Sequence, residues 1–289
     1  MQASVRAAVE QALGADVRSE RPVGGGDIND AYEAGLSDGR TVFVKTNDRA
    51  DAAMFPAEAR GLAWLEEARA LRLPKVLAVS AGESDRPNFL VLEHLGSSVP
   101  ARGFDDELGR GLAALHRFGA PSFGLDHDNF IGRLPQANEP RATWPEFYGQ
   151  RRLAPQLGRA ERAGLADVGL RRSFDQLFAR LEQLCGPSEP PARLHGDLWG
   201  GNLHSDANGA PCLIDPAVYG GHREVDLAMM KLFGGFGERV FAAYDEAYPL
   251  CAGHAERVSL YQLYPLMVHV NLFGASYLGS VKRALTRYL

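Results

Sequence analysis

The sequence predicts an α+β protein of two lobes, a small N-terminal lobe built on an antiparallel sheet and a larger, mainly helical C-terminal lobe. Segments rich in β-branched and aromatic residues concentrate in the first third of the chain. After them, "GSSVPARG" at 96–103 is typical of a polar connector, and apolar residues then recur mostly at helical spacing. We therefore assign 1–95 to the N-terminal lobe and 96–289 to the C-terminal lobe, and expect a ligand cleft at the connector.

Composition and charge narrow the class of protein. The chain has 289 residues, 45% apolar and 23% charged, with a formal net charge of −5. These values are typical of a globular protein and exclude a generally basic nucleic-acid binder. Cys185, Cys212 and Cys251 have no CxxC spacing, so we expect a reducing, cytoplasmic location. No signal peptide or membrane span is expected, and the sequence does not indicate an oligomeric state.

The N-terminal third reads as a helix, a sheet of short strands and a second helix. "SDGR" contains Asp38-Gly39, which suits the positive backbone angles of a hairpin turn. The expected elements are a helix in 1–14, strands within 17–46, a helix over 54–71, and strands over 75–82 and 88–95.

The remainder reads as helices interrupted by one segment of short strands and loops. In the first of these helices Asp105 or Asp106 is expected near the N-cap, and the apolar stripe is made by Phe104, Leu108, Leu112 and Leu115. Further helical stretches are expected over 144–185 and from 223 to 289, with strands and loops around "LHGD" and "LIDP". His116 and His269 lie on apolar helical stretches and are expected to be hydrogen-bonded core histidines.

Lys45 and Glu58 form a candidate ion pair. Lys45 is the last residue but one of the strand "TVFVKT". Glu58 shares a helix face with Leu62 and Leu65, so its carboxylate points inward. Because a buried carboxylate needs a cation, we expect the two side chains to meet. The pair would hold the ammonium where it can contact phosphate groups. The alternative is that Glu58 is a surface glutamate on a helix with a wide apolar face.

A glycine run precedes this pair. Gly24, Gly25 and Gly26 in "VGGGDIND" could cover phosphates with backbone N–H groups, because glycine permits close approach. The same run is also compatible with an ordinary hairpin. It is not a Walker A loop, since no Gly-Lys-Ser/Thr follows.

The stretch "LHGDLWGGN" carries the densest set of candidate chemical groups. Asp197 and Asn202 lie five residues apart in a glycine-rich turn, and Asp215 follows the short apolar run "PCLI". In phosphoryl transfer a carboxylate orients the attacking hydroxyl, while an amide oxygen and a second carboxylate hold magnesium. The alternative is a loop whose polar side chains make local backbone bonds. Trp199 is either a loop anchor or a flat platform for a sugar or a linear amine.

These features follow one another in the order found in kinases. The chain resembles protein-kinase-like small-molecule kinases, and more narrowly the fructosamine kinase family (ketosamine-3-kinases). The resemblance covers nearly the whole chain. The segments that carry it are "GGGDINDAY", "FVKTN", "NFIGRLPQAN", "HGDLWGGN", "IDPAVYGGHREVDLAM" and "HVNLFGASY".

The resemblance implies ATP- and Mg²⁺-dependent phosphorylation of the 3-hydroxyl of ketosamines (fructosamine or ribulosamine adducts), a deglycation repair activity. The N-terminal lobe would bind the nucleotide and the C-terminal lobe would carry catalysis and the substrate. By position, the implied roles are Asp197 as base, Asn202 and Asp215 as magnesium ligands, Lys45 for phosphates, Glu58 to orient Lys45, the backbone of Glu93, His94 and Leu95 for adenine, Trp199 beside the sugar, and Asp226 as a brace of the catalytic turn.

Differences between this sequence and protein kinases narrow the class of substrate. Asp215 is followed by Pro216-Ala217, and the loop from there to Asp226 is short, so we expect a small molecule or an exposed adduct rather than a peptide. Asp27 stands near the place where some family members carry a cysteine, so no thiol switch is expected in this loop. Two alternatives stay open: an aminoglycoside- or choline-type kinase, and a nucleotide-binding pseudokinase without turnover.

Overall fold

The computed structural model describes residues 1–24, 28–80 and 87–289. Gly25 and Gly26 of the predicted phosphate-binding run, with Asp27, lie outside the described residues. The chain forms two compact units. Unit 1 contains Met1–Arg102 together with His204–Asp215, and unit 2 contains Gly103–Leu203 together with Pro216–Leu289.

Unit 1 is built on a five-stranded antiparallel sheet with the order β1-β2-β3-β5-β4. The predicted helix over 54–71 and strand over 75–82 are present but shorter, and the hairpin turn lies where predicted. The elements are α1 (Ala3–Leu13), β1 (Val17–Val23), β2 (Asp30–Leu36), β3 (Thr41–Thr46), α2 (Met54–Glu66), β4 (Val76–Val79) and β5 (Phe89–Glu93).

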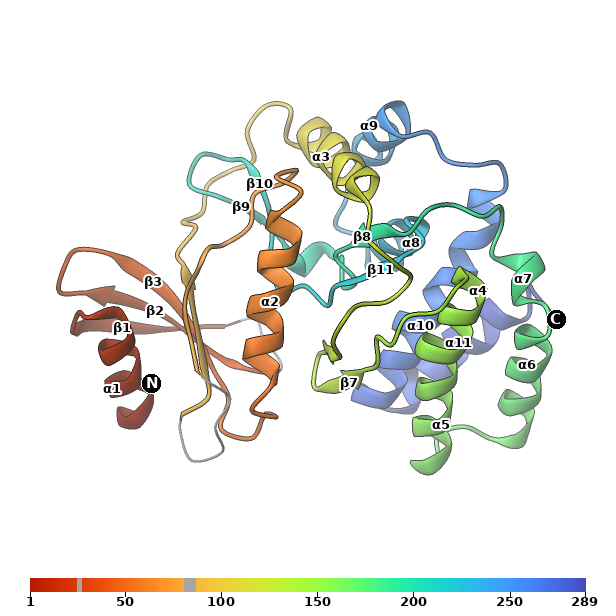
Figure 1. The fold of residues 1–289 in the computed structure, drawn as a ribbon, viewed down its shortest axis with the longest axis horizontal. Coiled ribbons are helices and arrows are strands. Elements are labelled where there is room, and N and C mark those ends of the chain that lie inside the picture. The colour runs from red at the N-terminus through yellow and green to blue at the C-terminus, as the bar shows by residue number, and fades with distance from the viewer. Residues whose placement is uncertain (25–27, 81–86) are drawn as a thin grey trace. The chain divides into compact units, whose positions relative to one another are not determined.

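The alternation of side chains along β3 decides which helix each residue meets. Val42 and Val44 are fully buried and pack in one cluster with Val5 and Val9 of α1. Lys45 therefore points to the opposite face of the sheet, the face covered by α2. Figure 1 shows α1 and α2 on the two sides of this sheet. The period of two in a short strand thus delivers the lysine to the helix that carries Glu58.

A small hairpin from much later in the chain also belongs to unit 1. It consists of β9 (Leu203–Ser205) and β10 (Pro211–Leu213). The Ala207 N–H donates to the Leu95 carbonyl at 3.0 Å, and the His204 ring contacts the Gly96 carbonyl. This hairpin therefore fixes the backbone that follows β5. The segment of unit 1 that contains the hairpin ends at Asp215, two residues after β10.

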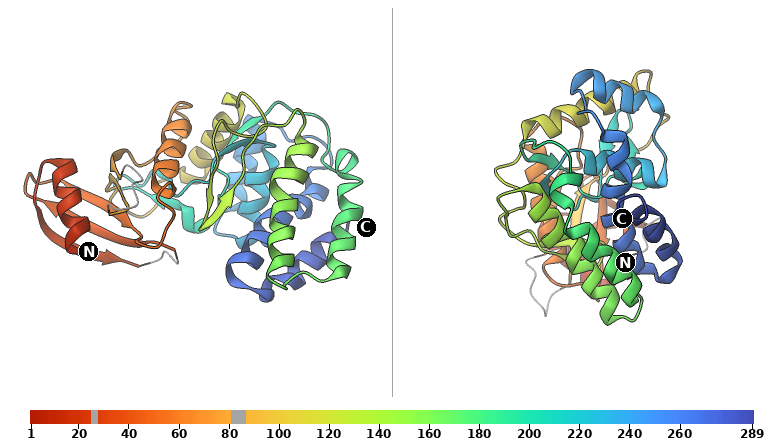
Figure 2. Two further views of the ribbon diagram at one scale, coloured as in Figure 1. Left: turned by 60° about the horizontal axis from the view of Figure 1, so that its bottom comes forward. Right: turned by 90° about the vertical axis from the view of Figure 1, so that its right-hand side faces the viewer.

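Unit 2 is mainly helical, as predicted. Its central element is α10 (His254–Phe273), which packs against α5, α8 and α11 and buries most of its length. Figure 2 shows the blue C-terminal helices beside the green helices of the same unit. The other helices are α3 (Phe104–Phe118), α4 (Trp144–Phe147), α5 (Ala154–Arg162), α6 (Val168–Phe178), α7 (Leu181–Leu184), α8 (Glu224–Phe233), α9 (Glu238–Ala247) and α11 (Leu278–Leu285). A π-helical turn, Tyr148–Leu153, joins α4 to α5, and short 3-10 turns occur at Gly200–Asn202 and Ala275–Tyr277.

Four short strands complete unit 2, as two antiparallel pairs. They are β6 (Asn129–Ile131) with β7 (Leu134–Gln136), and β8 (Ala192–Leu194) with β11 (Tyr219–Gly221). The second pair carries the "LHGD" turn at one end.

The predicted cap of α3 is wrong. The residue before the helix is Gly103, with φ +89, and no side chain caps the helix. Asp105 and Asp106 lie in the first turn instead, and Asp106 pairs with Arg110 and Arg239. The negative charges of these two carboxylates still interact favourably with the positive N-terminal end of the helix dipole.

None of the helices in the described part of the chain combines the length and apolar character that crossing a membrane requires.

Candidate active site

Lys45 and Glu58 make the contact predicted from their spacing. The Lys45 Nζ lies 2.7 Å from Glu58 Oε1 and 2.9 Å from Oε2, and its side chain is 7% exposed. The Asp215 carboxylate also accepts from this ammonium, at 3.1 Å. All three donors of the ammonium can therefore be used by carboxylate oxygens. The candidate phosphate-binding lysine is held by one carboxylate from α2 and a second from the end of the β9–β10 hairpin.

Charge, rather than hydrophobic packing, holds this cluster together. Burial alone would lower the pKa of the Lys45 ammonium, but the charges of Asp215 and Glu58 outweigh it and raise that pKa. Burial raises the pKa of Glu58, against the attraction of Lys45. Lys45 is therefore a permanent cation in this site.

Asp215 has an unusual backbone conformation. Its φ is +55, in the left-handed region that aspartate tolerates better than most residues. Its side chain is 46% exposed, in contrast to Lys45 and Glu58. One oxygen is bound to Lys45 while much of the carboxylate faces solvent, an arrangement that suits a cation ligand.

The residues predicted to contact adenine lie at the end of β5. The Glu93 side chain is engaged by Arg72 at 2.5 Å, and the His94 ring lies 3.2 Å from Glu33. The carbonyl of Leu95 accepts from Ala207 in the β9–β10 hairpin. Gly24 directly follows β1. The nucleotide-binding roles of these residues stay predictions.

In unit 2, Asp226 holds the backbone of the turn that carries Asp197. This residue lies in the first turn of α8 and is fully buried. Its Oδ2 accepts from the His195 N–H at 2.8 Å, and its Oδ1 accepts from the Gly196 N–H at 2.9 Å. His116 of α3 lies 3.2 Å from the same carboxylate and 2.8 Å from the Tyr244 hydroxyl. His116 is thus the hydrogen-bonded core histidine predicted from the sequence.

The pKa of Asp226 reflects these bonds. Burial would raise it, but the hydrogen bond and charge of His116, with smaller contributions from His195 and the Gly196 N–H, hold it below its ordinary value. Asp226 is therefore an anion whose charge is used to fix the turn.

A glycine is required at the bend of this turn. Gly196 has φ +83, and a Cβ atom there would lie 2.1 Å from the Ala217 carbonyl oxygen. The Ala217 N–H in turn donates to the His195 carbonyl at 2.9 Å. The turn is thus clamped to the segment that begins two residues after Asp215, and a side chain at this position would separate them.

Asp197 and Asn202 face each other across the turn. The Asn202 Nδ2 donates to the Asp197 backbone carbonyl at 2.8 Å and to its carboxylate at 3.2 Å. Because the amide nitrogen points at Asp197, the amide oxygen points away from it. Trp199 lies back over Gly201, where a Cβ atom would come within 2.3 Å of the indole, and is 40% exposed. The turn therefore brings a carboxylate, an amide group and a flat ring together.

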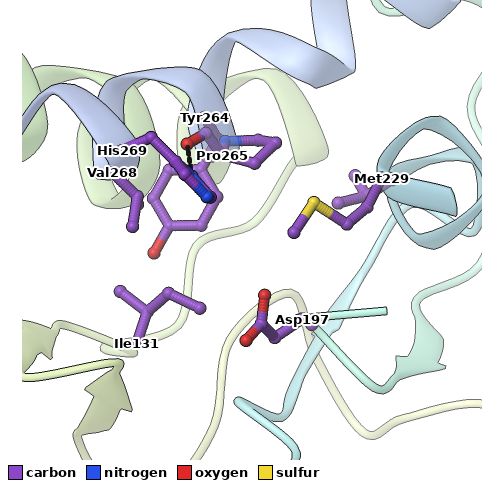
Figure 3. A pocket seen from close by; sticks show the side chains of 9 residues that line it. Ile131, Asp197, Met229, Tyr264, Pro265, Val268 and His269 are labelled. Carbon is purple, nitrogen blue, oxygen red and sulfur yellow. Dashed lines mark hydrogen bonds between the residues drawn. The ribbon is translucent and has the colours of Figure 1, made fainter. Parts of the chain in front are cut away.

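The Asp197 carboxylate enters a pocket with mostly apolar walls. Figure 3 shows it pointing into the space between Met229 and Ile131, with Tyr264 and His269 on the wall supplied by α10. One carboxylate among apolar side chains is a common arrangement in small-molecule sites. The lining residues are Ile131, Gly196, Asp197, Val225, Met229, Tyr264, Pro265, Val268 and His269.

Sequence reasoning missed the wall supplied by α10. His269 was expected in the core, and its Nδ1 does bond the Pro265 carbonyl, at 2.8 Å, but the ring is only partly buried and lines the pocket. The one available signal was the resemblance segment "HVNLFGASY", which contains His269 but does not say which way it points.

A buried polar network supports the pocket from behind. The Tyr264 hydroxyl donates to Gln136 Oε1 at 2.5 Å, and the Gln136 amide donates to Asn129 at 2.8 Å and to the Ala217 carbonyl at 3.1 Å. Arg152 extends the network through the Asn138 side chain, which also donates to Asn129. The segment "NFIGRLPQAN" thus links the pocket wall to the backbone after Asp215, a role that the sequence did not reveal.

Comparison with known proteins first establishes the class. A solved structure of the aminoglycoside phosphotransferase APH(4)-Ia matches with a TM-score of 0.64 at 17% sequence identity, covering 99% of each chain, a likeness that shows the fold alone. The antiparallel sheet of unit 1 and the helices of unit 2 belong to the protein-kinase-like fold. The predicted fold class and enzyme class are confirmed.

The family follows from closer relatives. The fructosamine kinase family matches residues 1–289. A chloroplastic protein-ribulosamine 3-kinase of Arabidopsis thaliana is 39% identical over 270 residues, which cover 92% of this chain and 81% of that protein. A crystal structure assigned as a fructosamine-3-kinase of Thermobifida fusca YX-ER1 is 40% identical, with a TM-score of 0.89 over 99% of this chain and 98% of that one. The chain belongs to the fructosamine kinase family.

Proposed function

We propose that the protein transfers the γ-phosphoryl group of ATP to the 3-hydroxyl of ketosamines, with ribulosamine and fructosamine adducts as substrates. Membership of the fructosamine kinase family supports the reaction, and the related ribulosamine 3-kinase supports the first of these sugars. The observation in this chain that carries the proposal is the Asp197 carboxylate, which enters an apolar pocket from a turn fixed by Asp226.

Asp197 is the proposed base. A carboxylate in this position orients the incoming hydroxyl and accepts its proton as the bond to phosphorus forms. Its backbone is held from two sides, by Asp226 through the preceding N–H groups and by Asn202 through the carbonyl. The turn therefore holds the base in place before the substrate arrives, which lowers the entropic part of the barrier.

Magnesium is the proposed cofactor, held by Asn202 and Asp215. Within the described parts of the chain no group of three or more histidine, cysteine, aspartate or glutamate side chains is placed to hold a metal ion. Magnesium requires less, since it keeps several waters and is bound by one or two protein oxygens with substrate phosphates. The hard oxygen donors of an amide and a carboxylate fit that ion. When bound, it would neutralise charge on the transferred phosphoryl group.

Nucleotide binding is assigned to the N-terminal lobe, 1–95. Lys45 would contact the α- and β-phosphates, with Glu58 fixing its direction. The backbone at Glu93–Leu95 would contact adenine, and the glycine run that begins at Gly24 would cover the phosphates. Trp199 would lie beside the sugar in the C-terminal lobe, 96–289. On sequence grounds we also propose a cytoplasmic location.

One substrate panel tests the reaction and its runner-up. Magnesium-dependent ADP release is measured with ribulose-lysine, fructose-lysine, choline and an aminoglycoside, and the phosphate position in each product is read by phosphorus NMR. Phosphate on the sugar 3-oxygen is the expected result. Turnover on choline or the aminoglycoside alone would keep the kinase class and exclude the ketosamine assignment. ATP binding without any product would favour a pseudokinase.

A further inference from the structure

A row of aromatic rings continues outward from the Asp197 pocket. Phe233 lies 6.5 Å from the Trp199 ring and 4.6 Å from the His269 ring, measured between ring centroids. His269 lies 5.4 Å from Phe273 and 5.0 Å from Tyr277. We call these five side chains the aromatic strip.

Three members of the strip are unusually exposed for large apolar side chains. Trp199, Phe233 and Phe273 are 40%, 39% and 47% exposed. Single exposed apolar residues need no explanation, but a contiguous group beside a polar catalytic turn indicates a binding surface. Tyr277 packs against the main core of unit 2 and anchors the far end of the strip.

The strip is held against the catalytic turn by a close backbone contact. A Cβ atom at Gly200 would lie 3.1 Å from the Gly234 carbonyl and 3.2 Å from the Gly235 Cα. Gly234, which directly follows Phe233, has φ +74. The absence of side chains at these glycines lets the loop after α8 approach the turn, and so sets Phe233 edge-on to Trp199.

His269 belongs to both the pocket and the strip. It lines the pocket that Asp197 enters and contacts three of the four other rings. Burial lowers the pKa of His269, against the hydrogen bond to the Pro265 carbonyl, so the ring is neutral at physiological pH. A neutral imidazole does not repel a cation, and the neighbouring aromatic faces attract one.

We propose that the aromatic strip, beyond the sugar at Trp199, binds the amine carrier of the substrate, namely the hydrocarbon arm on the ketosamine nitrogen together with its ammonium. This inference rests on the proposed function. In a ketosamine the amine is attached to C1 and the reacting hydroxyl to C3, so a hydroxyl at Asp197 places the nitrogen only a few bonds away. The arm then leaves the pocket past His269 toward Phe273. Methylene groups, such as the four of a lysine side chain, gain apolar contact there.

The test compares two carriers on one sugar. Ribulose adducts of methylamine and of n-hexylamine are assayed for kcat/KM with the wild type, and the ratio of the hexyl to the methyl value is taken. Neither amine carries a carboxylate. This choice avoids attraction to Arg133, whose guanidinium donates to the Leu272 carbonyl next to Phe273. We expect a ratio of about ten in the wild type and a fall of about fivefold in Phe273→Ala.

A matched control is available on another helix. Phe118 ends α3 and is 53% exposed, and its contact is the Arg193 guanidinium rather than the strip. Phe118→Ala should leave the ratio at the wild-type value, and Phe273→Tyr, which restores a ring, should return it. If Phe273→Ala fails to fold, Phe273→Leu, which offers the arm less apolar surface than phenylalanine does, should lower the ratio by a smaller amount.

Each contrary outcome has a distinct meaning. A wild-type ratio near one, or a ratio that Phe273→Ala leaves unchanged while ketosamines are phosphorylated, would overturn the carrier site and leave the proposed function standing. Equal falls in Phe273→Ala and Phe118→Ala would also overturn it. Absence of turnover with both adducts would refute the ketosamine reaction itself.

Discussion

The two units hold their key charged groups in opposite ways. In unit 1, Lys45 is fixed by side chains of opposite charge, Glu58 and Asp215. In unit 2, the turn that carries Asp197 is fixed through its backbone, by the buried carboxylate of Asp226. Charge pairing suits the role proposed for Lys45, which must remain a cation to bind phosphates, whereas backbone bracing suits the role proposed for Asp197, a base whose position matters most. Disruption of the first should act on nucleotide binding, and disruption of the second on the chemical step.

The largest effect is expected from removing the brace. Asp226→Ala leaves the buried His195 and Gly196 N–H groups and His116 without their acceptor, and should cost about 4 kcal/mol of unfolding free energy. Urea unfolding measures the loss. Asp226→Asn keeps one acceptor oxygen and should cost less. A loss under about 1 kcal/mol in the alanine variant would show that the brace is dispensable.

Breaking the Lys45–Glu58 ion pair by removing only the cation should lower the free energy of unfolding by about 3 kcal/mol. Lys45→Met leaves Glu58 buried without its partner, and the double variant Lys45→Met/Glu58→Leu should recover most of the loss. Because burial raises the pKa of Glu58, the single variant should regain stability as the pH falls and the carboxyl protonates. Thermal melts of the three proteins between neutral and acid pH would check this, and additive losses in the double variant would contradict it.

A smaller effect should follow from loss of the network behind the pocket. Gln136→Leu removes the amide that joins Tyr264 to the Ala217 carbonyl. This substitution should lower the free energy of unfolding by about 2 kcal/mol. Since the network touches the pocket wall and not Lys45, kcat should fall while the dissociation constant for ATP stays constant. Tyr264→Phe, which removes one bond, should cost about 1 kcal/mol. A fall in ATP affinity without a change in kcat would reverse this assignment.

The smallest functional effect is expected at an ion pair in unit 2 that lies outside the proposed site. Burial would raise the pKa of Glu189, but hydrogen bonds from Arg223 and Cys251 lower it from 4.5 to about 2. Its contribution to stability is therefore present above pH 4.5 and is lost as the pH falls toward 2. Glu189→Gln should flatten the stability curve over that window and leave turnover at neutral pH unchanged. If Glu189→Gln leaves the loss of stability between pH 4.5 and 2 unchanged, the Glu189–Arg223 ion pair does not contribute to stability there.

Features that depend on residues close together in the sequence were predicted from the sequence. The period of two along β3 and the face of α2 were enough to bring Lys45 to Glu58, and the antiparallel sheet followed from strand composition and turn residues. The prediction that an aspartate caps α3 was wrong. The residue at the N-cap position is Gly103, which has no side chain to cap the helix.

Long-range contacts could not be read in this way. The β9–β10 hairpin meets the backbone after β5 through Ala207 and Leu95, more than a hundred residues apart. Likewise α10 supplies His269 to the pocket, although the helix is apolar nearly all round and its periodicity does not mark one face. Tertiary packing alone decides which of its residues meet Asp197.

The most direct test of the account is the single-turnover rate of Asp197→Asn with saturating ATP, magnesium and ribulose-lysine. This substitution keeps the shape of the side chain and removes its ability to accept a proton. We expect the rate to fall about a thousandfold while the dissociation constant for ATP is unchanged. Near-normal turnover would contradict the assignment of Asp197 as the base, and a parallel loss of ATP binding would contradict the division of roles between the two units.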